Sequence, residues 1–359
     1  MKQVDHPKGS FFRAALMVLF SVTSTTNQTG RNFQLDASRP WSLEDLKSPG
    51  NAECPSWTNP DPASRPDARA GHAMAYDTES DRVILFGGAP PGGTWAYDFH
   101  RNQWTNMNPP VSPPVTTGHA MAYDHESDRV ILFGGDDGFR DRRETWVYDF
   151  NTNAWTNMSP PLPPRERSAH AIVYDAQIDR VVLFGGCSGF PCQELGDTWT
   201  YDFNTNSWTN RNPAFAPSPR YGHAMAYYGR LGRCILFGGY DGNHKNDTWA
   251  YDFEVNAWRA LNPAFPPLAR RSHALVIDAR SNSAILFGGC LAPCKRSSDL
   301  SRETWAYDYD ANRWTDLDPA RSPTRRWLFG MVYDRRSSRI ILFGGSLGGG
   351  LISDETWTY

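Results

Sequence analysis

Five arginines recur at one position of a repeating pattern in this chain of 359 residues. Each arginine stands three residues before a histidine or the residue that replaces it. The arginines are Arg69, Arg167, Arg220, Arg270 and Arg326, and in the second copy Thr116 stands in place of the arginine. A guanidinium group keeps its charge and binds a carboxylate through two parallel hydrogen bonds. Gathered in one place, these side chains would bind an acidic ligand. The alternative is that each pairs with a carboxylate or carbonyl group of a turn in its own or the next copy.

Five histidines recur three residues further on, at His72, His119, His170, His223 and His273. Imidazoles bind one metal ion only if they converge to within about 2.1 Å of it. A residue that occupies the same strand position in successive copies is better explained as a hydrogen-bonded core residue. We therefore predict neither a metal site nor a cofactor.

Four of the six cysteines form two closely spaced pairs, Cys187 with Cys192 and Cys290 with Cys294. If the chain is exported, these pairs predict two disulfides that fix surface loops. The alternative is a four-cysteine zinc site, which would have to join two copies of the repeat. Cys234 lies in an apolar run and is expected to be a buried thiol, whereas Cys54 has no evident partner.

The repeat itself is marked by Leu-Phe-Gly-Gly, which ends at Gly88, Gly135, Gly186, Gly239, Gly289 and Gly345, and each copy is followed by Thr-Trp-x-Tyr. Successive copies lie 47, 51, 53, 50 and 56 residues apart, a spacing typical of one four-stranded propeller blade. In the first copy, residues 72–76, 82–86, 94–97 and 103–105 are expected to form strands a, b, c and d. The Gly-Gly pair is followed by a tryptophan strand rather than a helix, so phosphate binding is not expected.

These units resemble the kelch-repeat family, whose blades carry a diglycine after strand b and a spaced Tyr or Trp pair further on. The resemblance runs from about Trp57 to Tyr359. It implies an all-β fold, a six-bladed β-propeller of four-stranded antiparallel blades. In kelch domains that capture acidic peptides, arginines at similar positions line the pocket, so the resemblance also implies an anion-binding site at the channel mouth.

The last copy ends at Tyr359 after its strand c, whereas residues 56–60 reproduce the strand d sequence found at residues 154–157. We expect this N-terminal strand, with Trp57, to complete the last blade and so close the ring.

The loops between strands b and c differ most among the copies, which marks them as a candidate binding face. On this face we expect Tyr240, His244 and Trp327 to join the arginines in binding a ligand; the alternative for Trp327 is that it fills the place left by the missing histidine of the last copy. The acid or base candidates among its loop residues are Glu144, Glu194, His244 and Glu303. We assign no catalytic residue.

The N-terminus is expected to direct export. Residues 1–24 place cationic flanks around a nine-residue apolar run, 14–22, which predicts a signal peptide; the alternative is a leader that is never cleaved. The run is too short to span a bilayer. Residues 25–52 are expected to be a polar linker and residues 53–359 the propeller, in a secreted or periplasmic monomer.

Two classes of function follow from this sequence. The first is a binding scaffold that recognises a protein segment, acidic if the arginines contact it, or a glycan at the channel mouth. The second is a carbohydrate-active enzyme that resembles the kelch-type sugar mutarotases or oxidases. A net charge of −3 indicates no nucleic-acid partner.

Overall fold

The computed structural model describes residues 56–88 and 92–359, and it is a ring of six antiparallel sheets with one small helical turn at Ser297–Asp299. The first three blades are built from β1 (His72–Asp77), β2 (Arg82–Gly87), β3 (Thr94–Asp98) and β4 (Gln103–Asn106); β5 (Ala120–Asp124), β6 (Arg129–Phe133), β7 (Thr145–Asp149) and β8 (Ala154–Asn157); and β9 (Ala171–Asp175), β10 (Arg180–Ser188), β11 (Gln193–Asp202) and β12 (Ser207–Asn210). The other three are built from β13 (Ala224–Tyr228), β14 (Arg233–Tyr240), β15 (His244–Asp252) and β16 (Ala257–Ala260); β18 (Ala274–Asp278), β19 (Ser283–Phe287), β21 (Thr304–Asp308) and β22 (Arg313–Asp316); and β23 (Gly330–Asp334), β24 (Arg339–Phe343) and β27 (Thr356–Thr358).

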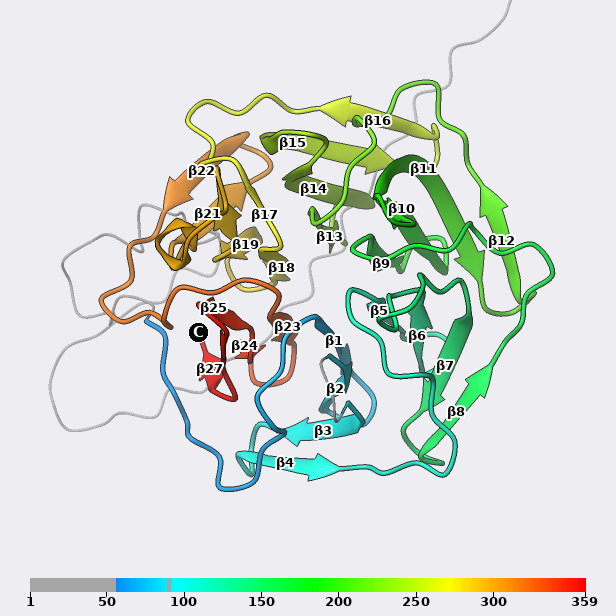
Figure 1. Cartoon of the computed structure of the whole chain (residues 1–359). Helices are drawn as coiled ribbons and strands as arrows, with labels where there is room; N and C mark the ends of the chain where they lie inside the picture. The colour runs from blue at the N-terminus through cyan, green and yellow to red at the C-terminus, as the bar shows by residue number, and fades with distance from the viewer. Residues whose placement is uncertain (1–55, 89–91) are drawn as a thin grey trace, which may run out of the picture. The chain divides into compact units, whose positions relative to one another are not determined.

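The first strand of each blade lies nearest the centre of the ring and the fourth strand lies at its rim (Figure 1). Each blade is an up-and-down meander, as the order β1-β2-β3-β4 shows. Neighbouring inner strands contact one another around the whole circle, and β1 contacts β23 to complete it. The predicted six-bladed propeller is confirmed.

Two short ribbons extend the blades at the loops. They pair β17 (Arg270–Arg271) with β20 (Cys290–Leu291) and β25 (Ser346–Gly348) with β26 (Leu351–Ile352). Within the described residues, no helix is long and apolar enough to cross a membrane.

The core between blades repeats one aromatic contact six times. The fourth-strand tryptophan of each blade packs on the phenylalanine that ends the second strand of the preceding blade, as Trp155 does on Phe86 with ring centroids 5.0 Å apart. Its indole N–H donates to the hydroxyl of a third-strand threonine in that preceding blade; the pairs are Trp104–Thr356, Trp155–Thr94, Trp208–Thr145, Trp258–Thr198, Trp314–Thr248 and Trp57–Thr304, all at 2.9–3.0 Å. Burying both the ring and its polar N–H in this way fixes the angle between blades.

The ring closes at Trp57, as predicted. Thr58 pairs antiparallel with Thr358 through two backbone hydrogen bonds of 2.8 Å, so the N-terminal segment supplies the fourth strand of the last blade. Trp57 is fully buried and packs on Phe287 and Tyr359.

The repeated Gly-Gly pair is structural, because the next blade passes too close for a side chain. A Cβ added to Gly87 would lie 2.5 Å from the His119 ring and 2.8 Å from the Thr116 carbonyl oxygen, and the residue has a φ of +75°. Only glycine fits both constraints.

Candidate functional site

One face of the propeller carries nearly all the exposed apolar side chains that the structure describes. We call it the mouth face; it is formed by the loops between the second and third strands of each blade and by the connections between blades. Ten of the eleven described exposed large apolar residues lie there: Val111, Val115, Phe139, Leu162, Phe190, Phe215, Phe265, Leu268, Leu351 and Ile352. Exposed apolar groups gathered on one side of a soluble domain mark an interaction surface.

The five repeated arginines lie beneath this face, with at most 1% of each residue exposed. Arg167 shows the arrangement: its guanidinium donates to both carboxylate oxygens of Asp197, at 2.6 and 2.8 Å, and to the Gly185 carbonyl oxygen at 2.9 Å. Arg220 pairs in the same way with both oxygens of Asp247, whereas Arg270 and Arg326 each donate to one oxygen of Glu303 and Glu355. The structure therefore shows the pairing that was the alternative to ligand binding, and any binding role for these arginines stays a prediction.

Each of these carboxylates also accepts a hydrogen bond from the third-strand tryptophan, as Asp197 does from Trp199 at 2.6 Å. Burial alone would raise the pKa of Asp197, but the hydrogen bonds and charge of Arg167 outweigh it and hold the pKa below its usual range. The arginine, the acid and the tryptophan form one buried network that ties a connection between blades to the third strand.

The first two blades depart from this network. Gly93 stands where the acid would be in the first blade, and Arg69 donates instead to the carbonyl oxygens of Gly87 and Gly92 at 3.0 and 2.8 Å. In the second blade Thr116 replaces the arginine, and Arg142 from the adjacent loop pairs with Glu144 at 3.4 Å.

The histidines are buried packing residues beneath the same face. Each ring lies edge-on to the phenylalanine of the preceding blade, as His223 does to Phe184 at 5.4 Å. Burial lowers the pKa of His72 and His223 to about 3 and that of His119 to about 4, and it lowers those of His170 and His273 well below the usual value. All five are neutral at pH 7.

The prediction that the histidines are hydrogen-bonded is right for only part of the set. His119 bonds the Thr116 hydroxyl at 3.0 Å and the Phe86 carbonyl oxygen at 3.1 Å, and His72 accepts from the Gly330 N–H at 3.1 Å. In His170, His223 and His273 neither ring nitrogen has a hydrogen-bond partner among the described residues. The neighbouring phenylalanine carbonyl groups are near enough to act on the pKa values of these three, but the geometry falls short of a bond.

A closed ring of backbone hydrogen bonds lies two residues after the arginine position. The N–H of each residue donates to the carbonyl of its counterpart in the preceding blade, at 2.6–3.1 Å, through Gly71, Gly118, Ala169, Gly222, Ser272 and Leu328. We call this set the backbone hoop. The side chains just before the hoop are not repeated; they are Ala70, Thr117, Ser168, Tyr221, Arg271 and Trp327.

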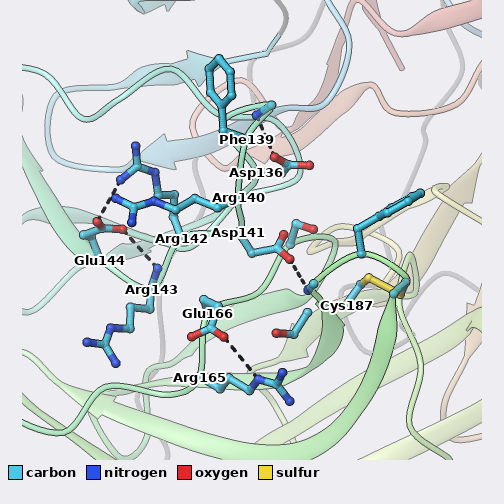
Figure 2. A pocket seen from close by; sticks show the side chains of 16 residues that line it. Asp136, Phe139, Arg140, Asp141, Arg142, Arg143, Glu144, Arg165, Glu166 and Cys187 are labelled. Atoms are coloured by element: carbon cyan, nitrogen blue, oxygen red, sulfur yellow. Dashed lines mark hydrogen bonds and ion pairs between the residues drawn. A yellow bond between two sulfur atoms is a disulfide. The ribbon is translucent and has the colours of Figure 1, made fainter.

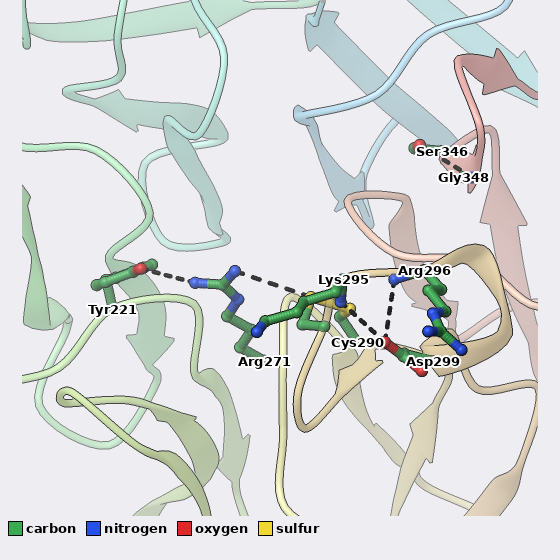
Figure 3. Close-up of a disulfide and its surroundings, with 9 residues drawn as sticks. Tyr221, Arg271, Cys290, Lys295, Arg296, Asp299, Ser346 and Gly348 are labelled. Carbon is green, nitrogen blue, oxygen red and sulfur yellow. Dashed lines mark hydrogen bonds between the residues drawn. A yellow bond between two sulfur atoms is a disulfide. The ribbon is translucent and has the colours of Figure 1, made fainter.

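Five side chains gather at the mouth in the last three blades, and we call them the mouth cluster: Tyr221, Tyr240, His244, Arg271 and Trp327. The Arg271 guanidinium lies over the rings of Tyr240, Tyr221 and Trp327, at 5.1, 5.6 and 6.0 Å from their centroids. It donates to the Tyr221 hydroxyl at 2.7 Å and contacts the Cys294 sulfur at 3.8 Å, between Tyr221 and the disulfide in Figure 3. The structure thus brings together Tyr240, His244 and Trp327, three of the residues singled out in the sequence.

Arg271 differs from its neighbour Arg270 in having no counterion among the described residues. Arg270 pairs with Glu303 at 2.5 Å, whereas no described carboxylate pairs with Arg271, and its Nε atom is buried without a partner. Burial and the charge of Arg271 lower the pKa of His244, whose ring lies 5.3 Å from that of Tyr240. The mouth cluster therefore presents one uncompensated positive charge within an aromatic frame.

The disulfides form as the spacing predicted, Cys187 with Cys192 and Cys290 with Cys294. Cys234 is buried and free, and Cys54 lies outside the described residues, as do the predicted signal peptide and linker. Within the described part of the chain, no three His, Cys, Asp or Glu side chains are placed to hold a metal ion.

A model of the KLHDC2/KLHL20/DRC7 Kelch-repeats domain matches residues 91–289, more than half of the chain. The chain belongs to the kelch-repeat family. Human and mouse proteins named Host cell factor 1 are 37% identical to it over 83 residues, which is 22% of this kelch chain and 4% of each relative's length. A solved structure titled "Structure of YjhT" superposes with a TM-score of 0.65 over 82% of this chain and 96% of the other, at 14% identity, and so shows a shared fold.

Arg271 and Tyr221 are the kelch mouth residues that sequence reasoning missed. The signal was present, because the position after each repeated arginine changes chemistry from blade to blade while the arginine does not. In a repeat protein the unvaried positions build the scaffold, and the varied ones at the same rim are free to recognise a ligand.

Proposed function

We propose that this kelch propeller is a binding module that holds an acidic segment of a partner protein over the mouth cluster. The observation that carries the proposal is the Arg271 guanidinium, which is framed by three aromatic rings and has no carboxylate partner among the described residues. Carboxylates are the side chains that an arginine of this kind pairs with best. Lys295, exposed on the loop that follows Cys294, adds positive charge beside it, whereas Arg296 lies next to Asp299 (Figure 3).

The exposed apolar residues of the mouth face support a protein as the partner. Aromatic residues and arginine supply most of the binding energy at protein interfaces. The proposal includes export of the module, since disulfides persist in oxidising compartments. It also takes the exported module to be a monomer. Recognition of a glycan at the same aromatic rings is the other ligand class expected from the sequence, and a glycan array would test it.

Replacement of Arg271 by glutamine should abolish the preference for acidic ligands. The probes are two fluorescein-labelled dodecapeptides that differ only in a central Asp-Glu-Glu or Asn-Gln-Gln triplet. Loss of one charged hydrogen-bonding partner predicts about 10- to 100-fold weaker binding of the acidic probe. Fluorescence anisotropy measures both affinities.

Arg335→Gln is the matched control, because it removes the same charge from an exposed turn outside the mouth face. Equal binding of the two probes by the unaltered protein would contradict the proposal. So would an equal loss of binding in Arg271→Gln and Arg335→Gln.

A carbohydrate-active enzyme is the second candidate, favoured by His244 beside Tyr240 in the mouth cluster. A neutral imidazole next to a phenol and an aromatic face has the groups needed to move a proton on a bound sugar. The other acid or base candidates are less available, since Glu303 pairs with Arg270 and Glu144 with Arg142. Glu194, the remaining acid or base candidate, lies on β11 opposite Cys187 on β10.

Anomer exchange measured by NMR separates the two candidates. With reducing hexoses as probes, the binding proposal predicts the uncatalysed rate of exchange. A faster rate that His244→Ala abolishes would establish the enzyme instead.

A further inference from the structure

A cavity opens on the mouth face between the second and third blades, away from the mouth cluster. It has a volume of about 950 Å³ and lies between the loop after β6 and the disulfide loop between β10 and β11 (Figure 2). A cavity of this size suits a few residues of a peptide. We propose that it is a second protein-binding site, which takes an extended segment of a partner protein carrying a large apolar side chain next to carboxylates.

Two phenylalanines stand at the edges of this cavity, one on each loop. Phe139 is 96% exposed and Phe190 is fully exposed, and both line the cavity. Each would gain from covering its ring with an apolar side chain, because burying a phenylalanine is among the largest favourable contributions to binding. We therefore expect a ligand to place an apolar side chain between the rings of Phe139 and Phe190.

Both loops already have a fixed shape. The carboxylate of Asp137 accepts hydrogen bonds from the N–H groups of Phe139 and Arg140, both at 2.9 Å, and it also pairs with Arg142. The Cys187–Cys192 disulfide closes the other loop. Loops ordered before binding lose little conformational entropy when a partner arrives.

One hydrogen bond joins the two loops that line the cavity. The Gly189 N–H donates to the Asp141 carboxylate at 2.7 Å, so the second and third blades present their phenylalanines as one unit. Figure 2 shows the Asp141 carboxylate turned toward the loop that carries Cys187.

Four arginines and four carboxylates line the cavity, and they differ in whether their side chains already have a partner. All four carboxylates are engaged: Asp136 by the Gly138 N–H, Asp141 by the Gly189 N–H, Glu144 by Arg142 and Glu166 by Arg165. Two arginines remain, Arg140 and Arg143, which are exposed and whose guanidinium groups have no hydrogen-bond or ion-pair partner among the described residues. The Arg143 side chain extends away from Glu144 in Figure 2 and acts on Glu166 only through space. These two guanidinium groups call for carboxylates on the segment.

The test begins with a phage-displayed library of random 12-residue peptides selected on the full chain. The proposal expects a class of peptides in which Asp or Glu neighbours Leu, Ile, Phe or Trp. Fluorescein-labelled copies are then measured by anisotropy against variants. Phe139→Ser with Phe190→Ser should weaken this class about 30-fold or more, and Arg140→Gln with Arg143→Gln about tenfold. The arginine variant should also reduce the dependence of affinity on salt.

The matched control is Phe215→Ser with Phe265→Ser, which removes two exposed phenylalanines of the same face that do not line the cavity. It should leave the affinity within about twofold, as should Arg271→Gln. Equal losses in the two phenylalanine pairs would overturn the proposal, and so would a peptide class indifferent to Arg140 and Arg143. Peptides that are lost only with Arg271→Gln would support the mouth cluster and overturn this second site, and recovery of no saturable peptide would overturn it as well.

Discussion

Replacement of Trp57 by alanine should lower the free energy of unfolding of the whole propeller by about 3–5 kcal/mol, the usual cost of removing a large buried aromatic side chain. The indole packs on Phe287 and Tyr359 and donates to Thr304. It also belongs to the segment that supplies the last strand of the ring. Deletion of residues 53–60 should cost more, because it also removes the backbone pairing of Thr58 with Thr358. Chemical denaturation followed by tryptophan fluorescence and far-ultraviolet circular dichroism measures both effects.

Trp208→Ala is the matched control, since Trp208 makes the equivalent contacts with Phe133, Tyr201 and Thr145 inside a covalently continuous blade. If the N-terminal strand is an ordinary member of the ring, the two substitutions should cost similar amounts. An unchanged melting temperature for Trp57→Ala beside a clear loss for Trp208→Ala would show that the ring does not depend on this closure.

Acid should unfold the propeller well above the pH at which its carboxylates are protonated. The five buried histidines are neutral in the folded protein, with pKa values of about 3 to 4 where they are resolved. In the unfolded chain they titrate near pH 6.5. Below pH 6.5 the unfolded chain therefore binds protons that the folded chain does not, and the free energy of unfolding falls with pH until the folded pKa values are reached. At pH 5 His72, His119 and His223 each contribute a loss of at most about 2 kcal/mol, and His170 and His273 act in the same direction.

The sixth blade provides the variant that tests this prediction. Phe329 occupies the histidine position there and packs edge-on to Phe287 at 5.5 Å. His223→Phe should keep the packing and flatten the pH dependence of unfolding by one proton between pH 6.5 and 4. His223→Ala should flatten it equally while lowering stability at pH 7 through the cavity it leaves. Denaturation curves across this range give the slope, and an unaltered slope in His223→Phe would rule out the histidines as its source.

The fold could be predicted from the sequence because the same sequence pattern is repeated in each blade. Leu-Phe-Gly-Gly fixed the period, and the tryptophan that follows it fixed the register of the third strand. Trp57 could be assigned to the last blade because the fourth-strand sequence was known from five other copies.

The candidate site was predicted only in part, for a physical reason. Repetition made Arg167 and its counterparts conspicuous, but it reflects a contact that four of the six blades make with their own carboxylate. Asp197 stands directly before the Thr-Trp pair, and an acid occupies that place in every blade except the first, which was the sequence signal for the pairing. For Arg271 the sequence offered only the variation of its position among the blades, and only the closed ring places it beside Tyr240 and Trp327.

The two loops that line the cavity between the second and third blades were marked as variable, but the roles of their residues were not evident. Phe139 and Phe190 are 51 residues apart in the sequence. The Gly189 contact to Asp141 that aligns their loops depends on how two blades stand side by side. A contact between two blades is a property of the packed ring and produces no local pattern in the sequence.

The backbone hoop sets an upper limit on what can pass along the axis of the propeller. Its six N–H groups and six carbonyl groups are engaged with one another in a single sense around the circle, so the aperture cannot widen unless at least one bond breaks. Each such bond stabilises the fold by about 1 kcal/mol, and the blades that it joins are packed from rim to centre. The hoop therefore holds the aperture at one width, which limits the size of any molecule that enters it from the mouth face.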